Sequence, residues 1–463
     1  MHYQNRLGRT AALLVVAALT GCSAMVHTPY VAPKVDVPQA WKQGATTSTE
    51  EVGDAWWRAF GDPRLDALID AVLRSNNNLA AATLKVRRAQ LQAGLARDKL
   101  VPALSASGSA NTSRYLDNNA ASTTRSNSAS VAVSYEADLW GKLGSQRDMA
   151  IWEARATEQD RRSTALALIG TTMDLYWQAA YLNERIDVSE QSIAYAEQTL
   201  ALVRVQQRAG ASSDLETYEA DQNLASQRAS HTELLQQRVE TANALAILLD
   251  GPPGVDIAAP GRLPDNPMPE VRAGLPAGLL SRRPDLRAAE MRLRESSANI
   301  DATRASYYPA LSLTGSLGSV SSSLLRVMQN PVATLGAGIT LPFLQWREMQ
   351  LTNKVSQNQF EEAVANFRQT LYQAMSDVEN GLSARTQYAA QAILLKQSYE
   401  AATSAERIYE IRYRSGAVAL KLLLDAQEKS RTAALAVTQN RLDQLQTHVT
   451  LYQALGGAPP DID

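Results

Sequence analysis

The stretch YYPALSLTGS, residues 307–316, decides the fold because a close copy of it, LVPALSASGS, occurs 207 residues earlier at 100–109. The match extends in the N-terminal direction, where 11 of the 32 positions in 78–109 are identical to their counterparts in 285–316. From the second strand-like segment of each copy onward, the offset is 206 residues, as for Trp140 and Trp346. A nearly constant offset over so long a stretch indicates two tandem copies of one structural unit.

Both copies have the same internal order. A helix of about 25 residues is followed by two strand-like segments, a very long helix, a break that contains glycine and another long helix. We predict repeat 1 over 63–254 and repeat 2 over 284–457, joined by a linker over 255–283. The predicted hairpins cover 103–137 and 310–343, the long helices cover 141–249 and 346–455, and the helices reverse at Gly210 and Gly416, because glycine commonly follows a helix end.

The strand-like segments alternate between apolar and small polar residues. In 128–135, Val131, Val133 and Tyr135 share one face, and serines dominate the other. In the second copy the same apolar phase runs through Leu335, Ala337, Ile339, Leu341 and Phe343. This alternation is typical of a half-buried sheet or of a barrel wall with lipid outside and water inside. A pair of hairpins packed on helices remains the alternative interpretation.

Four strands cannot close a barrel, and open sheet edges cannot face lipid. Two chains would give eight strands and an interior filled by side chains, whereas three chains give twelve strands and a lumen. We therefore expect a mainly α protein with membrane β structure. Its trimer would join a 12-stranded β-barrel to a coiled-coil barrel of twelve long helices, with four strands and four long helices from each chain.

The segment 141–209 contains no proline, and many of its apolar residues follow heptad spacing. One series includes Leu168, Leu175 and Leu182, which predicts left-handed coiled-coil packing. At ~1.5 Å per residue such a helix is roughly 100 Å long, which is too long for a compact globular domain. A plain coiled-coil spacer is the alternative that this segment leaves open.

The N-terminus has the pattern of a lipoprotein signal peptide. Two arginines precede the apolar run 11–19, and LTGC at 19–22 resembles a bacterial lipobox. The resemblance implies removal of residues 1–21 and attachment of acyl chains, such as palmitate, at Cys22, the only cysteine of the chain. Ser23 is not the aspartate that retains many such proteins at the inner membrane, so we expect an outer-membrane location.

Composition and motifs exclude several function classes. The net charge is −2, and loss of the two arginines in 1–21 makes it more negative, which disfavours nucleic-acid binding. After the signal peptide, no apolar run reaches the length of a membrane-spanning helix. The four histidines are scattered, and the sequence contains no HExxH, CxxC, GxSxG or P-loop motif. We expect no enzyme activity, no metal site and no cofactor other than the lipid on Cys22.

Several stretches together resemble the TolC-like outer-membrane efflux channels. The resemblance is to the lipoprotein branch of this family, whose members are the outer-membrane factors of resistance-nodulation-division efflux systems. These stretches are FGDPRLDALID (60–70), YEADLWGKL (135–143), RRPDLRAAEMRL (282–293), YYPALSLTGS (307–316) and LLLDAQEKSR (422–431). The resemblance implies a homotrimer in the outer membrane that extends into the periplasm. A periplasmic adaptor and an inner-membrane proton-driven transporter would be its partners, and 22–62 would form an extended segment and part of an equatorial region.

The resemblance also implies a periplasmic gate. Family members carry an aspartate in an LDAQ motif that lines a constriction, and here that position is Asp425. Some relatives have a leucine four residues earlier and an arginine three residues later, where this chain has Lys421 and Glu428. Three copies of Asp425 would favour cations in a narrow pore, and Lys421 lies one helical turn from Asp425. An ordinary solvated helix face is the alternative.

We expect the chain to be a passive outer-membrane duct for drugs and other small toxic compounds. One alternative is a lipid-anchored periplasmic coiled-coil scaffold without a pore. Another is the outer-membrane duct of a type I protein secretion system. The strand phase shared by the two copies favours a duct over a scaffold.

Overall fold

The computed structural model describes residues 27–43, 55–114, 123–254, 260–271, 273–274, 276–327 and 329–457. The expected signal peptide 1–21 and Cys22 lie outside this range, as does the loop of the first hairpin, 115–122. The chain forms two compact units. Unit 1 contains 1–35, 84–159 and 288–369, and unit 2 contains 36–83, 160–287 and 370–463.

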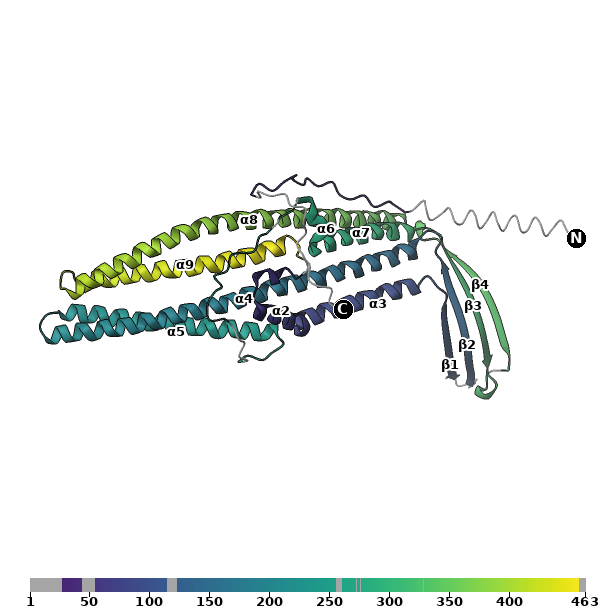
Figure 1. Ribbon diagram of the computed structural model, residues 1–463. Helices are drawn as coiled ribbons and strands as arrows, with labels where there is room; N and C mark the ends of the chain where they lie inside the picture. Colours follow the sequence, from purple (N-terminus) through teal and green to yellow (C-terminus); the bar gives the residue numbers. More distant parts are fainter. Residues whose placement is uncertain are drawn as a thin grey trace. The chain divides into compact units, whose positions relative to one another are not determined.

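Unit 1 contains an antiparallel sheet with the order β1-β2-β3-β4 (Figure 1). Its strands are β1 (Ala103–Arg114), β2 (Thr123–Ala137), β3 (Ala310–Ser321) and β4 (Pro331–Thr340). β2 of the first copy pairs with β3 of the second, so the two repeats share one sheet.

The register places most apolar residues of the four strands on one face, although Val320 and Val332 lie on the other. Val131 lies opposite Leu317, and Leu313 lies opposite Ala337. On the other face of the β1–β2 pair, the Oγ atoms of Ser107 and Ser130 lie 2.9 Å apart. Because directly opposed residues point to the same side, the two-residue period of each strand becomes an apolar face and a largely polar face of the whole sheet.

The second hairpin is shorter than the sequence predicts. β4 ends at Thr340, and the 3-10 turn η5 (Pro342–Leu344) follows it. Pro342 has no N–H to donate to a neighbouring strand, so pairing stops before it. Leu341 and Phe343 therefore belong to the connection between the strand and the next helix and not to the strand face.

Trp140 connects the two repeats where strands and helices meet in unit 1. Its indole N–H donates to the carbonyl of Pro309 at 2.8 Å, and its ring lies 4.8 Å from that of Tyr308.

Four long or medium helices contribute residues to both units: α3 (Asn77–Asp98), α4 (Lys142–Arg208), α7 (Pro284–Ala305) and α8 (Trp346–Arg414).

Unit 2 has its own core around α2 (Pro63–Ser75) and the 3-10 turn η2 (Trp56–Phe60). Asp62 caps α2 by accepting from the backbone N–H groups of Arg64 and Leu65, and it also accepts from the Tyr176 hydroxyl at 2.7 Å. Trp56 and Trp57 are buried, and Trp56 stacks on Tyr452 at 4.9 Å. These two tryptophans therefore pack in the core of unit 2.

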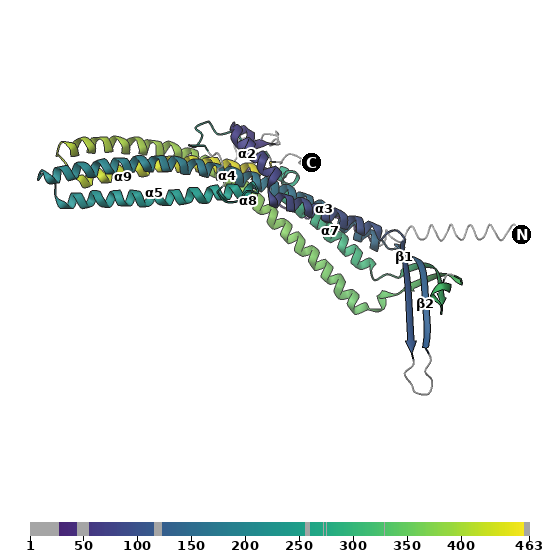
Figure 2. The ribbon, with the colours of Figure 1, turned by 90° about the horizontal axis from the view of Figure 1, so that it is seen from below.

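The other helices of unit 2 are α5 (Asp214–Leu248), α6 (Leu279–Arg282) and α9 (Leu420–Ala454). Figures 1 and 2 show α4 beside α5 and α8 beside α9, with both reversals at the same end of this unit. Heptad residues of α4 such as Leu182 and Val203 are fully buried. Within the described ranges, no helix is both long and apolar enough to cross a membrane.

Candidate functional site

The two helix reversals have the same backbone geometry. Gly210 and Gly416 both have φ of 74°, in the left-handed region. After each glycine, the next residue donates its N–H to a carbonyl five residues earlier: Ala211 to Gln206, and Ala417 to Arg412, each at 2.8 Å. A Cβ on either glycine would meet no atom within 4 Å, so the backbone angle and not crowding requires glycine here.

A small apolar cluster holds the reversal ends of four helices together. Its buried members are Ala196, Leu200 and Val203 of α4, Ala220 and Leu224 of α5, Tyr413 of α8, and Leu420 and Leu423 of α9. The Tyr413 hydroxyl donates to the side chain of Gln206 at 3.0 Å, which joins α8 to α4. Burial, with a smaller contribution from Glu216, raises the pKa of Tyr413, so this tyrosine remains a donor at neutral pH.

The two antiparallel helix pairs, α4–α5 and α8–α9, differ in how their second helix begins. Ser213 caps α5 by accepting from the backbone N–H of Glu216. Ala419 precedes α9 and has no side chain that could cap it. The first N–H of α9, from Leu420, instead donates to Glu216 at 3.5 Å. The Glu216 carboxylate of the α4–α5 pair therefore supplies the acceptor that the start of α9 lacks in the α8–α9 pair.

Lys421, Asp425 and Glu428 lie on one exposed face of α9, opposite the buried Leu420 and Leu423. The Lys421 ammonium lies 3.4 Å from Asp425, and these side chains are 67% and 51% exposed. Such an exposed pair contributes little to stability, so both groups remain available to solvent or ions.

Glu428 does not join that pair. It binds Arg431 one turn further along α9, a partner that sequence reasoning did not identify. The two residues line a cavity of about 220 Å³ among α4, α5, α8 and α9. Glu428 and Arg431 are three residues apart on one helix, and this spacing could have predicted the ion pair from the sequence.

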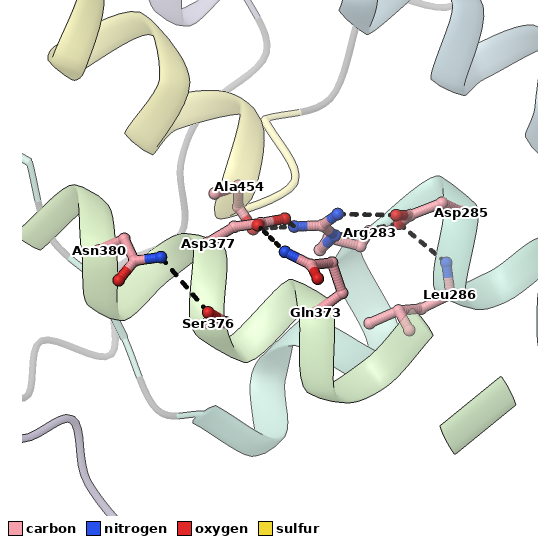
Figure 3. Close-up of polar contacts among 8 residues, drawn as sticks. All are labelled: Arg283, Asp285, Leu286, Gln373, Ser376, Asp377, Asn380 and Ala454. Atoms are coloured by element: carbon pink, nitrogen blue, oxygen red, sulfur yellow. Dashed lines mark hydrogen bonds and ion pairs between the residues drawn. The ribbon is translucent and has the colours of Figure 1, made fainter. Parts of the chain in front are cut away.

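A second polar centre of unit 2 surrounds Arg283 (Figure 3). Its guanidinium donates to both carboxylate oxygens of Asp285 at 3.0 and 2.7 Å, and to Asp377 and the carbonyl of Ala454 at 3.4 and 3.3 Å. The Arg283 side chain is only 13% exposed. Burial lowers its pKa, but the two aspartates outweigh burial and raise it, which keeps the guanidinium charged.

Arg283 connects the start of α7 to α8 and to the end of α9. It lines a cavity of about 590 Å³ together with side chains of α4, α8 and α9. Sequence analysis gave no role to Arg283. Its partners Asp377 and Ala454 are 94 and 171 residues away, so no local pattern could identify them.

Within the described residues, no group of three or more histidine, cysteine or acidic side chains is placed to hold a metal ion. Cys22, the expected lipid attachment site, lies outside the described residues.

Comparison with known proteins gives consistent results. The family model of the outer membrane efflux proteins matches this chain twice, over 68–251 and 275–457. The chain is 32% identical over 430 residues to the pyoverdine export outer membrane protein OpmQ of Pseudomonas putida, covering 91% of this chain and 92% of the relative. It is 32% identical over 454 residues to the antibiotic efflux pump outer membrane protein ArpC of the same species, covering 95% and 93%. The open-state MtrE outer membrane channel of Neisseria gonorrhoeae superposes with a TM-score of 0.80 at 28% identity, covering 93% of this chain and 98% of that one.

Proposed function

The chain belongs to the outer membrane efflux protein family, and from this premise we propose that it forms the outer-membrane duct of a tripartite efflux pump. In this role it is a passive conduit with no enzymatic step, and energy comes from its partners. Those partners are a periplasmic adaptor and a proton-driven transporter of the inner membrane. The duct carries drugs and other small toxic compounds from the periplasm to the exterior, in line with the antibiotic efflux named for ArpC.

The observation that carries this proposal is the four-stranded sheet of unit 1. Within the described residues, β1 and β4 are its edge strands, and each has a paired neighbour on one side only. Leu335 on β4 is 91% exposed, and further apolar side chains of the same face are open. Three copies of the sheet, joined edge to edge, satisfy the backbone groups and present this face to lipid. The assembly is therefore a homotrimer with a 12-stranded barrel and twelve long helices.

Cys22 carries the covalent lipid in this proposal, which anchors each chain in the outer membrane. The support is the sequence 19–22 and the apolar run before it. Acyl chains on three subunits, together with the barrel, would hold the trimer firmly.

The helix-reversal end of unit 2 is the proposed periplasmic gate. Its support is the exposed face with Lys421, Asp425 and Glu428 next to the reversals at Gly210 and Gly416. Three copies of Asp425 around the symmetry axis would attract cations. Asp425→Asn should therefore reduce the cation preference of the conducting trimer. The control Asp187→Asn, at an exposed position in the middle of α4, should leave the preference unchanged.

The first test is the mass of the detergent-extracted protein, measured by light scattering with the detergent contribution subtracted. A mass near three times the 50.2 kDa chain, together with conductance in a planar bilayer, would support the shared barrel. A stable monomer without conductance would instead favour the lipid-anchored scaffold. A conducting trimer that exports polypeptides but not dyes would favour the duct of a protein secretion system.

A further inference from the structure

The described N-terminal segment, 27–35, is fastened to α7 in unit 1. The backbone N–H of Thr28 donates to both carboxylate oxygens of Asp301 at 3.2 and 3.1 Å, and His27 Nδ1 lies 3.0 Å from the same carboxylate. Arg304 donates to the Thr28 hydroxyl at 3.0 Å, and the Arg294 guanidinium lies 4.7 Å over the Tyr30 ring. All of these partners of the segment belong to one helix.

The carboxylate of Asp301 is buried where the N-terminal segment attaches to α7. Its side chain is 3% exposed, whereas that of His27 is 71% exposed. A buried carboxylate is costly unless it accepts hydrogen bonds, and the N-terminal segment supplies them. The chain therefore fixes the position of Thr28, and with it the starting point of the six residues that lead back to Cys22.

Arg304 also lines a cavity of about 530 Å³ in unit 1. The cavity lies where α7 leads into β3 and where β4 leads into α8. Its other lining residues are mostly aromatic or apolar: Tyr307, Tyr308, Pro309, Phe343, Met349 and Asn353. The wall therefore combines aromatic and apolar side chains with the polar Arg304 and Asn353. Such a mixed lining suits the part of a hydrocarbon chain that lies next to its polar attachment point.

We propose that this cavity holds an acyl chain of the lipid attached to Cys22. The inference rests on the proposed lipidation of Cys22. Six extended residues span at most ~20 Å, so Cys22 stays within that distance of Thr28. The Thr28 hydroxyl in turn contacts Arg304, which lines the cavity. The tether gives this chain a high effective concentration that a free membrane phospholipid does not have. Burial of its methylene groups then stabilises the bound position.

The test uses cells that express the full chain and are fed a fatty acid with a diazirine near its methyl end. After irradiation, the purified protein is digested with trypsin and analysed by mass spectrometry. We expect the lipid of peptide 22–34 to be joined to at least one of the peptides that line the cavity, which are 305–326, 327–347 and 348–354. Cavity peptides that are cross-linked only to phospholipid would overturn the proposal. So would a peptide 22–34 whose attached lipid is cross-linked only to other lipids. An unmodified peptide 22–34 would refute the lipidation itself.

Two pairs of variants sharpen this test. Thr28→Pro removes the N–H that Asp301 accepts and should lower the cross-link yield roughly tenfold, whereas Val31→Pro at an exposed position of the same segment should not. Met349→Glu places a charge in the cavity and should also lower the yield, while Leu351→Glu on the same helix, outside the cavity lining, is its control. An unchanged yield in both Thr28→Pro and Met349→Glu would contradict the proposal.

Discussion

Asp174 on α4 illustrates the cost of a buried acid. One of its carboxylate oxygens is buried without a hydrogen-bond partner among the described residues. Burial raises its pKa from 3.8 to about 6. The folded state therefore binds a proton more tightly than the unfolded state does. The charged form destabilises the fold at pH values above the folded pKa, and this cost disappears as the pH falls to the unfolded pKa.

Asp174→Asn should consequently stabilise the protein at pH 8 by at most about 3 kcal/mol, and the gain should vanish near pH 4. The measurement is the free energy of unfolding in denaturant at both pH values. Asp187→Asn, at an exposed position of the same helix, serves as the control. An equal gain for Asp174→Asn at both pH values would show that the carboxylate charge is not the cause.

Arg283 is the residue on which three helices of unit 2 converge. Arg283→Met should cost about 2–4 kcal/mol because it leaves Asp285 and Asp377 without their cation and the Ala454 carbonyl without a donor. Arg283→Lys should fall in between, since an ammonium cannot make the two parallel bonds to Asp285. Thermal unfolding of the purified protein measures both. A loss no larger than that of Lys396→Met, at an exposed position of α8, would argue against a structural role.

At the scale of elements, the reversals at Gly210 and Gly416 depend on one backbone angle each. Replacing either glycine by alanine should cost about 1–2 kcal/mol, because an L-residue is strained in the left-handed region. Gly94→Ala is the opposite control: it lies inside α3, where an added Cβ would meet no atom within 4 Å, and alanine there should stabilise by about 1 kcal/mol. Equilibrium unfolding compares the three variants. A destabilising Gly94→Ala together with neutral substitutions at the reversals would contradict this account.

Elements with a regular period could be predicted from the sequence. The two-residue alternation around Val131 and Leu335 indicated the strands, and the heptads of 141–209 indicated a helix that the structure has as α4, Lys142–Arg208. Features that depend on distant partners could not be predicted. Glu216, for example, meets Leu420 across 204 residues. The early end of β4 is different, because Pro342 was a local signal that alternation alone did not take into account.

At the scale of the whole molecule, the sheet is the part that a single chain leaves with an exposed apolar face and with edge strands paired on one side only. Its register aligns most apolar residues of β1 to β4 on one face, yet Leu104, Leu317 and Ile339 on that face are exposed. An exposed apolar face of this extent needs either lipid or a partner surface. The family assignment and the open edge strands favour lipid together with neighbouring copies of the chain.

Leu335 and Thr334 give a direct test, because they are neighbours on β4 and point to opposite faces. If the apolar face contacts lipid, Leu335→Lys should destabilise the assembled protein by about 2–4 kcal/mol near the middle of the membrane. Thr334→Lys should be tolerated, because its side chain would point into an aqueous lumen. The measurement is the yield of heat-modifiable trimer in outer-membrane extracts of matched cultures. Similar yields for both variants would mean that the two faces have the same environment, which a barrel wall does not allow and a periplasmic scaffold does.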